Sequence, residues 1–282
     1  MRSKPPIALE AAQAAFGEQY AIEHPIGFGA MAVVFFGRSR ENSREVAVKV
    51  LRPELGASLF AGLFHREIRT LGALNHSNIL PMLACHDADN LLAYVMPYAP
   101  NGALRNRLAR EGQLSLDQTL AVARQVAAAL DYLHAQDVLH RDVKPENVVF
   151  DADGTALLCD FGLARVLQRA TKDGLKTSKI LLGTPEYMSP EQVSGRSDDL
   201  THHSDIYALA CVVWEMLAGE PPFTGKSFRT VIAKHAQEPP PRIRVPRPDV
   251  PARVEAALLS ALAKDPAERQ ASAQELVEQM EG

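Results

Sequence analysis

The sequence His-Arg-Asp-Val-Lys-Pro-Glu-Asn occupies residues 140–147, and Asp-Phe-Gly follows at residues 160–162. Together the two motifs supply two carboxylates, an ammonium group and an amide. Asp142 can take a proton from a hydroxyl group, and Lys144 can neutralise a phosphoryl oxygen. Asn147 and Asp160 can supply the hard oxygen ligands that Mg²⁺ prefers. The set predicts a site for phosphoryl transfer.

Further motifs stand on both sides of this pair, in a fixed order. With them the chain resembles the protein kinases from about Tyr20 to Glu278, and it is most similar to the bacterial Hanks-type kinases. Lys144 is typical of the serine/threonine branch. The additional motifs are Gly-Phe-Gly-Ala-Met-Ala-Val-Val at 27–34, Val-Ala-Val-Lys at 46–49, Phe-His-Arg-Glu at 64–67, Gly-Thr-Pro-Glu-Tyr-Met-Ser-Pro-Glu at 183–191, Ser-Asp-Ile-Tyr-Ala-Leu at 204–209, and Arg269 after Asp265-Pro266.

The resemblance implies an α+β, bilobal fold with a small β-rich N-lobe that contains one helix and a larger helical C-lobe. The residue pattern agrees, because short alternating runs precede Tyr98 and helical periodicity follows it. We expect an N-terminal extension at 1–19, the N-lobe at 20–96, a hinge at 97–101 and the C-lobe at 102–282. The expected strands include Val33–Phe36, Glu45–Leu51 and Leu91–Met96, and the expected N-lobe helix is Leu59–Leu74.

Two local patterns support the helical C-lobe. Ser115 and Gln118 form a predicted capping box at the start of a long helix. Six prolines between Glu238 and Pro251 exclude regular helix there and predict a surface loop between helices. The predicted apolar face of the long helix comprises Leu116, Leu120, Ala123, Ala127 and Leu130.

The resemblance implies a nucleotide site built from the N-lobe and the hinge. Alone, Gly27-x-Gly29 is more typical of a hairpin turn, but with Lys49 behind it we expect backbone N–H groups close to phosphate oxygens. The third expected glycine is Ala32, which brings the tightness of loop closure into question. Phe28 is expected to belong to the nucleotide site with the two glycines. Val34, Ala47 and Val149 are expected to enclose the adenine, and Met96 is the expected gatekeeper. The Pro97 C=O is expected to accept from the adenine amino group, and the Ala99 N–H to donate to the ring.

The expected catalytic residues also follow from the resemblance. Lys49 is expected to hold the α and β phosphates with Glu67 as its partner, although in isolation each is more typical of a solvated charge. Asp142 is expected to orient the acceptor hydroxyl, which Lys144 and Thr184 bracket. Asn147 and Asp160 are expected to hold Mg²⁺, His140 to pack against Phe161 rather than act as a base, and Glu191 to form a buried bridge with Arg269.

The predicted activity is therefore transfer of the γ-phosphoryl group of ATP to serine and threonine hydroxyls of proteins, with Mg²⁺, or Mn²⁺ as a substitute. The resemblance also implies that Arg141 pairs with a phosphate on the segment between Asp160 and Glu191. We therefore expect control by autophosphorylation of this segment, with self-association in trans. Thr177 and Ser178 are the first candidates and Thr171 the third. One rival is a pseudokinase scaffold, which ATP turnover would distinguish. Another is a small-molecule phosphotransferase, against which the peptide-docking segment at 183–191 argues.

Composition limits the remaining classes. The 282 residues are 46% hydrophobic, enough for a sizeable core, and a net charge of −4 gives no general reason to expect nucleic acid as a partner. Three widely spaced cysteines suit a reducing cytosol as small buried side chains. No apolar run approaches the roughly 20 residues that span a bilayer. We expect a cytoplasmic protein, or the cytoplasmic catalytic fragment of a longer membrane-anchored kinase.

Overall fold

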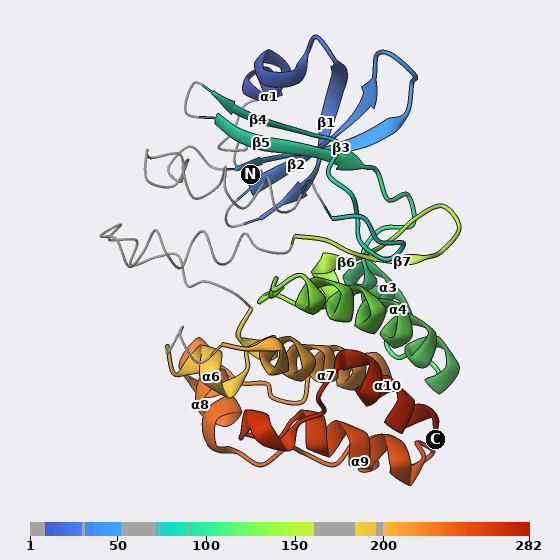
Figure 1. Cartoon of the computed structure of the whole chain (residues 1–282), viewed down its shortest axis with the longest axis vertical. Coiled ribbons are helices and arrows are strands. Elements are labelled where there is room, and N and C mark those ends of the chain that lie inside the picture. Colours follow the sequence, from blue (N-terminus) through green and yellow to red (C-terminus); the bar gives the residue numbers. More distant parts are fainter. Residues whose placement is uncertain are drawn as a thin grey trace. The chain divides into compact units, whose positions relative to one another are not determined.

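The computed structural model describes residues 9–29, 32–51, 72, 74–88, 91–160, 184–195 and 200–282. The chain divides into two compact units (Figure 1). The described part of the first comprises residues 9–29, 32–51, 72, 74–75, 80–88 and 91–100, and that of the second residues 76–79, 101–160, 184–195 and 200–282. The first is β-rich and the second is larger and mostly helical, which confirms the α+β, bilobal fold class. The predicted domain limits stay a prediction.

The first unit is built on a five-stranded antiparallel sheet. Its order is β1-β2-β3-β5-β4, so β3 lies at its centre. The three predicted strands are confirmed, and β2 and β5 extend beyond their predicted ends. The expected helix at 59–74 lies almost wholly outside the described residues. The strands are β1 (Tyr20–Phe28), β2 (Ala32–Ser39), β3 (Glu45–Leu51), β4 (Ala84–Ala88) and β5 (Leu91–Pro97).

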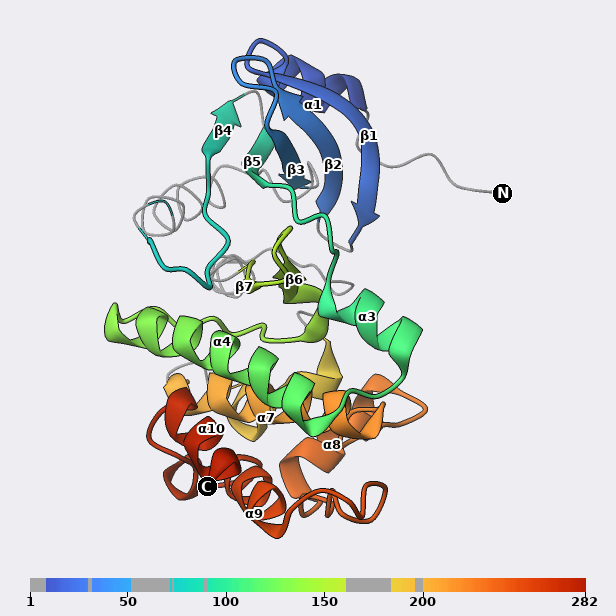
Figure 2. The ribbon, with the colours of Figure 1, turned by 90° about the vertical axis from the view of Figure 1, so that its right-hand side faces the viewer.

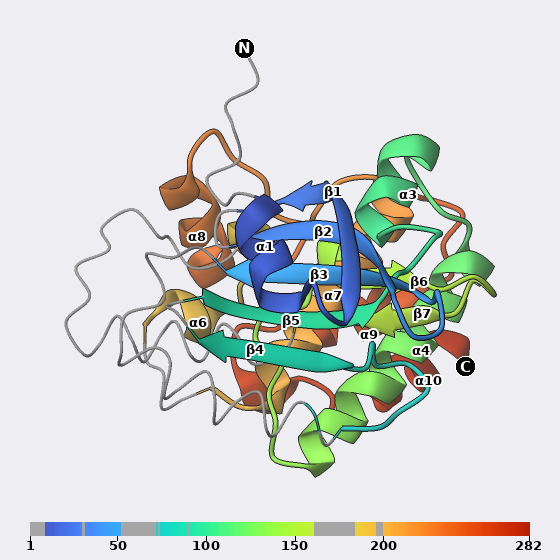
Figure 3. The same cartoon turned by 90° about the horizontal axis from the view of Figure 1, so that it is seen from above.

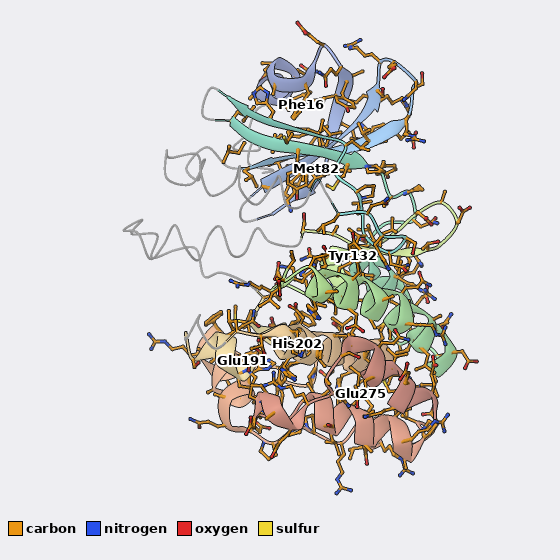
Figure 4. The ribbon with its side chains drawn as sticks, in the orientation of Figure 1. Phe16, Met82, Tyr132, Glu191, His202 and Glu275 are labelled. Carbon is orange, nitrogen blue, oxygen red and sulfur yellow. The ribbon has the colours of Figure 1, made fainter. Side chains whose placement is uncertain are left out.

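A short helix, α1 (Leu9–Phe16), covers one face of this sheet, where the sequence indicated only an extension (Figure 3). Phe16 is 5% exposed and belongs to the same core as the inward side chains of β2, β3 and β5 (Figure 4). Gln13 fixes the helix to β1 because its Nε2 donates to the Ile22 C=O at 3.0 Å. The helix therefore stabilises the sheet from the side opposite the predicted nucleotide residues.

The second unit packs its helices around α7 (His202–Ala218) (Figure 2). The residues of α7 from Ser204 to Leu217 are all buried. A helix that is apolar on most sides is expected at the centre of a core. α4 packs against α7 and α10, and α10 also contacts α9. The other elements are α3 (Leu104–Glu111), α4 (Leu116–Ala135), β6 (Val148–Phe150), β7 (Ala156–Leu158), α6 (Pro190–Val193), α8 (Phe228–Gln237), α9 (Ala252–Ala261) and α10 (Ala273–Glu281), with 3₁₀ turns η2 (Pro145–Asn147), η3 (Pro185–Tyr187) and η5 (Pro266–Glu268).

The start of α4 confirms the predicted capping box: the Gln118 N–H donates to Ser115 Oγ at 3.2 Å, and the Ser115 N–H donates to Gln118 Oε1 at 3.0 Å. The predicted apolar face is partly wrong, because Leu116 and Leu120 are only half-buried. The buried side is rotated toward Thr119, Val122 and Val126. The proline-rich stretch lies between α8 and α9 without regular helix, as predicted.

The cysteines differ from the expectation in one case. Cys159 and Cys211 are buried, whereas Cys85 is exposed on β4. The edge position of β4 explains this, since one side of an edge strand faces solvent. In the part of the chain that the structure describes, no helix combines the length and apolar character needed to cross a bilayer.

A buried histidine on α8 makes the stability of the second unit depend on pH. His235 is fully buried, and its Nδ1 lies 2.8 Å from the Tyr207 hydroxyl. Burial, followed by the positive charge of Lys264, lowers the pKa of His235 to about 4. Lys264 lies over the Phe223 ring, 4.3 Å from its centroid, on the same side of the core.

We predict that this histidine destabilises the folded state in acid. Between pH 6.5 and about 4 the imidazole of the unfolded chain binds a proton, while that of the folded protein stays neutral. The contribution of His235 to the stability of the fold is therefore fully present above pH 6.5 and is lost as the pH falls toward 4. The loss is on the order of 3 kcal/mol. Thermal unfolding of wild type and His235→Gln from pH 7 to 4 should show a shallower acid decline for the variant. The exposed His24, changed to glutamine, should keep the wild-type slope, and parallel slopes for all three would contradict the prediction.

Candidate active site

The segment between α4 and β6 brings together the side chains of two predicted catalytic residues and one predicted metal ligand. Lys144 Nζ lies 2.7 Å from Asp142 Oδ2, and Asn147 Nδ2 donates to the same oxygen at 3.1 Å. Asn147 Nδ2 also donates to the Asp142 C=O at 2.7 Å. Pro145 begins the single turn η2, which returns the chain so that residue 147 faces residue 142. The Asp142 side chain is 26% exposed and remains within reach of a ligand.

Asp160 is tied to this segment through its neighbour in the chain. The Cys159 N–H donates to the Asn147 C=O at 2.9 Å, directly after β7, which pairs with β6. Asp160 itself has φ 64°, in the left-handed region that non-glycine residues seldom adopt. The arrangement places the Asp160 backbone next to that of Asn147. The two residues thus offer a carboxylate and an amide oxygen, a donor set that fits Mg²⁺ in combination with phosphate oxygens.

His140 is fully buried and holds the backbone of the catalytic segment from the interior of the unit. Its Nδ1 accepts the Asp142 N–H at 3.2 Å, so Nε2 carries the proton and donates to the Cys159 C=O at 3.0 Å. Burial lowers the pKa of His140, which keeps the imidazole neutral. Both ring nitrogens are engaged inside the protein. This geometry agrees with a bracing role and excludes His140 as a general base; its expected contact with Phe161 lies outside the described residues.

Asp205, at the start of α7, anchors the backbone of the same segment. Its Oδ2 accepts the His140 N–H at 2.9 Å and Oδ1 accepts the Arg141 N–H at 2.7 Å. His134 Nε2, at 2.8 Å from Oδ2, must be the donor because a carboxylate only accepts. Burial raises the pKa of Asp205, but these hydrogen bonds, above all from His134, outweigh it and hold the pKa below its usual value. No sequence motif indicated that His134 would contribute to this anchor.

The segment that begins at Thr184 ends in a buried ion pair. Arg269 NH1 and NH2 donate to Glu191 Oε1 and Oε2 at 2.8 and 2.9 Å, which confirms the predicted bidentate bridge. Ser204 Oγ donates to the same carboxylate at 2.6 Å. Burial raises the pKa of Glu191, but the hydrogen bonds and charge of Arg269 outweigh it and keep the carboxylate ionised. Thr184 caps the turn η3, and its expected place beside the acceptor hydroxyl stays a prediction.

A second charged network connects this segment to the catalytic one, and sequence reasoning missed it. Arg105, on α3, donates from Nε to Glu146 Oε1 at 2.8 Å and from NH1 to Glu215 Oε1 at 2.5 Å. Tyr187, in η3, donates its hydroxyl to Glu215 and accepts from Arg105. Burial, followed by the negative charge of Glu215, raises the pKa of Tyr187. The four residues of this network lie far apart in the sequence, so the network can be recognised only in the folded structure.

In the first unit, the sheet places the predicted nucleotide residues on one face. Cross-strand partners share a face, and the register pairs Gly27 with Val34, Val34 with Lys49, and Ala47 with Met96. Lys49 and Ala47 are two residues apart on β3, so their side chains point the same way. The α1 core lies on the opposite face. Phe28 is exposed near the end of β1, and Lys49 Nζ lies 5.9 Å from the centroid of the Tyr94 ring.

The end of β5 fixes the direction of one predicted hinge group. The Tyr98 N–H donates to the Glu45 C=O at 3.2 Å, so this N–H points toward β3. Because the backbone groups of successive strand residues alternate in direction, the C=O of Pro97, the last residue of β5, points away from β3. The expected contact of the Ala99 N–H stays a prediction. The pairing of β4 with β5 stops at Val95.

Several predicted site residues could not be placed against the others. Glu67, Thr171, Thr177 and Ser178 lie outside the described residues. Val149 lies in β6 of the second unit, where it pairs with Leu157.

Comparison with known proteins identifies the family of this chain. The profile of the family described as Protein kinase domain matches residues 20–280, and the chain therefore belongs to the protein kinase family. Its relatives include the serine/threonine-protein kinase PknD of Mycobacterium tuberculosis, 37% identical over 259 residues, which are 91% of this chain and 38% of the relative. PknB of the same species is 35% identical over 264 residues, 92% of this chain and 42% of the relative.

PknB of Mycobacterium leprae is 34% identical over 264 residues, again 92% of this chain and 42% of the relative. These matches confirm the resemblance to bacterial Hanks-type serine/threonine kinases. The chain spans about two fifths of the length of the curated relatives it matches.

Proposed function

We propose that the chain is the catalytic domain of an ATP-dependent kinase that phosphorylates serine and threonine residues of proteins. One observation carries the proposal: the ammonium of Lys144 and the amide of Asn147 meet on a single oxygen of Asp142. Phosphoryl transfer depends mainly on positioning and on charge stabilisation, and these three groups provide both.

The two oxygens of Asp142 have different roles in this proposal. Lys144 and Asn147 both contact Oδ2, so Oδ1 is the oxygen that we assign to the acceptor hydroxyl. A carboxylate held in this way orients the hydroxyl and takes its proton as the new P–O bond forms. The Lys144 ammonium neutralises charge on the transferred group, and Thr184 borders the acceptor site. We assign a short aliphatic hydroxyl, as in serine and threonine, to this acceptor site.

Asn147 and Asp160 would hold the metal. Because Asn147 uses its Nδ2 for Asp142, its Oδ1 is the atom that can bind an ion. With the Asp160 carboxylate it forms a hard oxygen pair that suits Mg²⁺, with Mn²⁺ as a substitute. Bound there with ATP, the ion supplies charge neutralisation for the phosphates.

The nucleotide would bind on the sheet face that carries Val34, Ala47 and Lys49, with Val149 completing the adenine contacts. The direction of the Pro97 C=O supports its assignment to the adenine amino group. The Ala99 N–H would donate to the ring, and Met96 would be the gatekeeper. Backbone N–H groups of Gly27, Phe28 and Gly29 would approach the phosphates. Glu67 would orient Lys49 on the α and β phosphates.

Regulation by autophosphorylation, through self-association in trans, is part of the proposal. Arg141 directly precedes Asp142, and a phosphate on Thr177, Ser178 or Thr171 would pair with its guanidinium.

The test is to incubate the purified protein with ATP and Mg²⁺ and to identify the phosphorylated residues by mass spectrometry. We expect phosphoserine and phosphothreonine, including sites between residues 160 and 191. A predominance of phosphotyrosine would contradict the acceptor assignment. Absence of any phosphoryl transfer, with folded protein and bound nucleotide, would favour the scaffold alternative.

A further inference from the structure

Two helices in the second unit begin with the same capping box, and in the described structure only one of the two capping glutamines donates a hydrogen bond to the catalytic segment. Ser115 and Gln118 cap α4, and Ser189 and Gln192 cap α6. In both boxes the glutamine Oε1 accepts the serine N–H, at 3.0 and 2.9 Å. Gln192 makes one additional bond: its Nε2 donates to the Arg141 C=O at 2.9 Å.

The Arg141 C=O belongs to the peptide group that carries the Asp142 N–H. That N–H donates to His140 Nδ1 at 3.2 Å, so the peptide group is held at both of its ends, by His140 and by Gln192. The preceding peptide is held by Asp205, which accepts the Arg141 N–H at 2.7 Å. Arg141 has φ 68°, a left-handed conformation that is unfavourable for a non-glycine residue and persists only where its surroundings impose it.

The other end of this connection is firmly anchored. Gln192 follows Glu191, whose carboxylate is clamped by Arg269. The position of α6 is therefore transmitted through the Gln192 amide to the peptide from which the Asp142 side chain projects. A small rotation of that peptide would move the carboxylate away from Lys144 and Asn147, and positioning of reacting groups is sensitive to such displacements.

We propose that Gln192 is a positioning residue for phosphoryl transfer. Its side-chain amide locks the Arg141–Asp142 peptide and thereby aims the Asp142 carboxylate, while the rest of its side chain caps α6. The inference rests on the proposed kinase activity. It assigns a function to the donor half of the Gln192 side chain that a capping role alone does not require.

The test separates the two halves of this side chain. Gln192→Glu keeps the length and the oxygen that accepts the Ser189 N–H, but it replaces the donor with an oxygen that faces the Arg141 C=O. We expect kcat to fall about tenfold, as for loss of one hydrogen bond and an added oxygen–oxygen contact, with the KM for ATP changed less than about twofold. Gln118→Glu, the matched change in the α4 box, should leave both constants at their wild-type values.

A second pair of variants distinguishes loss of positioning from a folding defect. Gln192→Met removes donor and acceptor, whereas Ser115→Ala weakens the matched cap of α4; Tm is measured for all variants. We expect Gln192→Met to lower kcat about fivefold, and Ser115→Ala, whatever its loss of Tm, to stay near wild-type kcat. Wild-type kcat in Gln192→Glu, or equal losses of kcat in Gln192→Met and Ser115→Ala, would overturn the inference. A wild type without phosphoryl transfer would instead refute the proposed function.

Discussion

Replacing Asp160 with asparagine, or Lys49 with methionine, is expected to lower kcat/KM at least about a hundredfold, on the order of 3 kcal/mol of transition-state stabilisation. Asp160→Asn removes the only full negative charge of the proposed metal pair, since Asn147 contributes a neutral amide. Lys49→Met keeps most of the side-chain volume and removes the charge assigned to the α and β phosphates. Each change therefore deletes electrostatic stabilisation without removing a core side chain.

Steady-state kinetics with a protein substrate would measure both effects. Matched controls are Asp153→Asn in the exposed turn between β6 and β7, and Lys226→Met, also exposed; both should stay within about twofold of wild type. Thermal unfolding of each variant would show that the fold is kept. Near-normal kcat/KM in either active-site variant would contradict the assignment of that residue.

Replacing Arg269 with methionine is expected to lower the free energy of unfolding by about 3–5 kcal/mol, because it leaves the Glu191 carboxylate buried without its partner. The Arg269 side chain is 0% exposed and that of Glu191 7% exposed, so water does not screen the charge that remains. Arg269 also donates to the backbone C=O groups of Ala263 and His203, at 2.9 and 3.0 Å, which would lose their donor.

A double variant tests whether the uncompensated charge is the cause. Arg269→Met combined with Glu191→Gln removes the charge and should regain part of the lost stability in urea unfolding. The control is Arg38→Met, which breaks a pair with Glu23 at 2.7 Å in which Arg38 is 47% exposed; it should cost at most about 1 kcal/mol. Equal costs for Arg269→Met and Arg38→Met would show that the buried bridge does not hold the fold as described.

The sequence predicted most of the fold because its local and global patterns agree. The β2, β3 and β5 strands alternate or are continuously apolar, and the long α4 helix starts at a capping box. The α1 helix was missed because its eight residues are too short for a clear periodic signal and only the sheet beneath Phe16 stabilises it. The α4 face was partly misjudged, since the burial of Thr119 depends on tertiary packing that propensity does not contain.

The catalytic segment was predicted because its residues lie close together in the sequence. Long-range partners were not: Arg105 and Glu215 are 110 positions apart, and His134 meets Asp205 across 71 positions. The contribution of Gln192 did carry a signal, since Ser189 and Gln192 repeat the spacing of Ser115 and Gln118. Its bond to Arg141, however, depends on how α6 packs.

The most direct measurement is a crystal structure of the protein with Mg²⁺ and a non-hydrolysable ATP analogue. The proposed function predicts the adenine amino group within hydrogen-bond distance of the Pro97 C=O, a ring nitrogen accepting from the Ala99 N–H, and Mg²⁺ bound by Asn147 Oδ1 and the Asp160 carboxylate. It also predicts Lys49 Nζ on the α and β phosphates. A nucleotide bound elsewhere, or a metal ion that contacts neither Asn147 nor Asp160, would contradict the site.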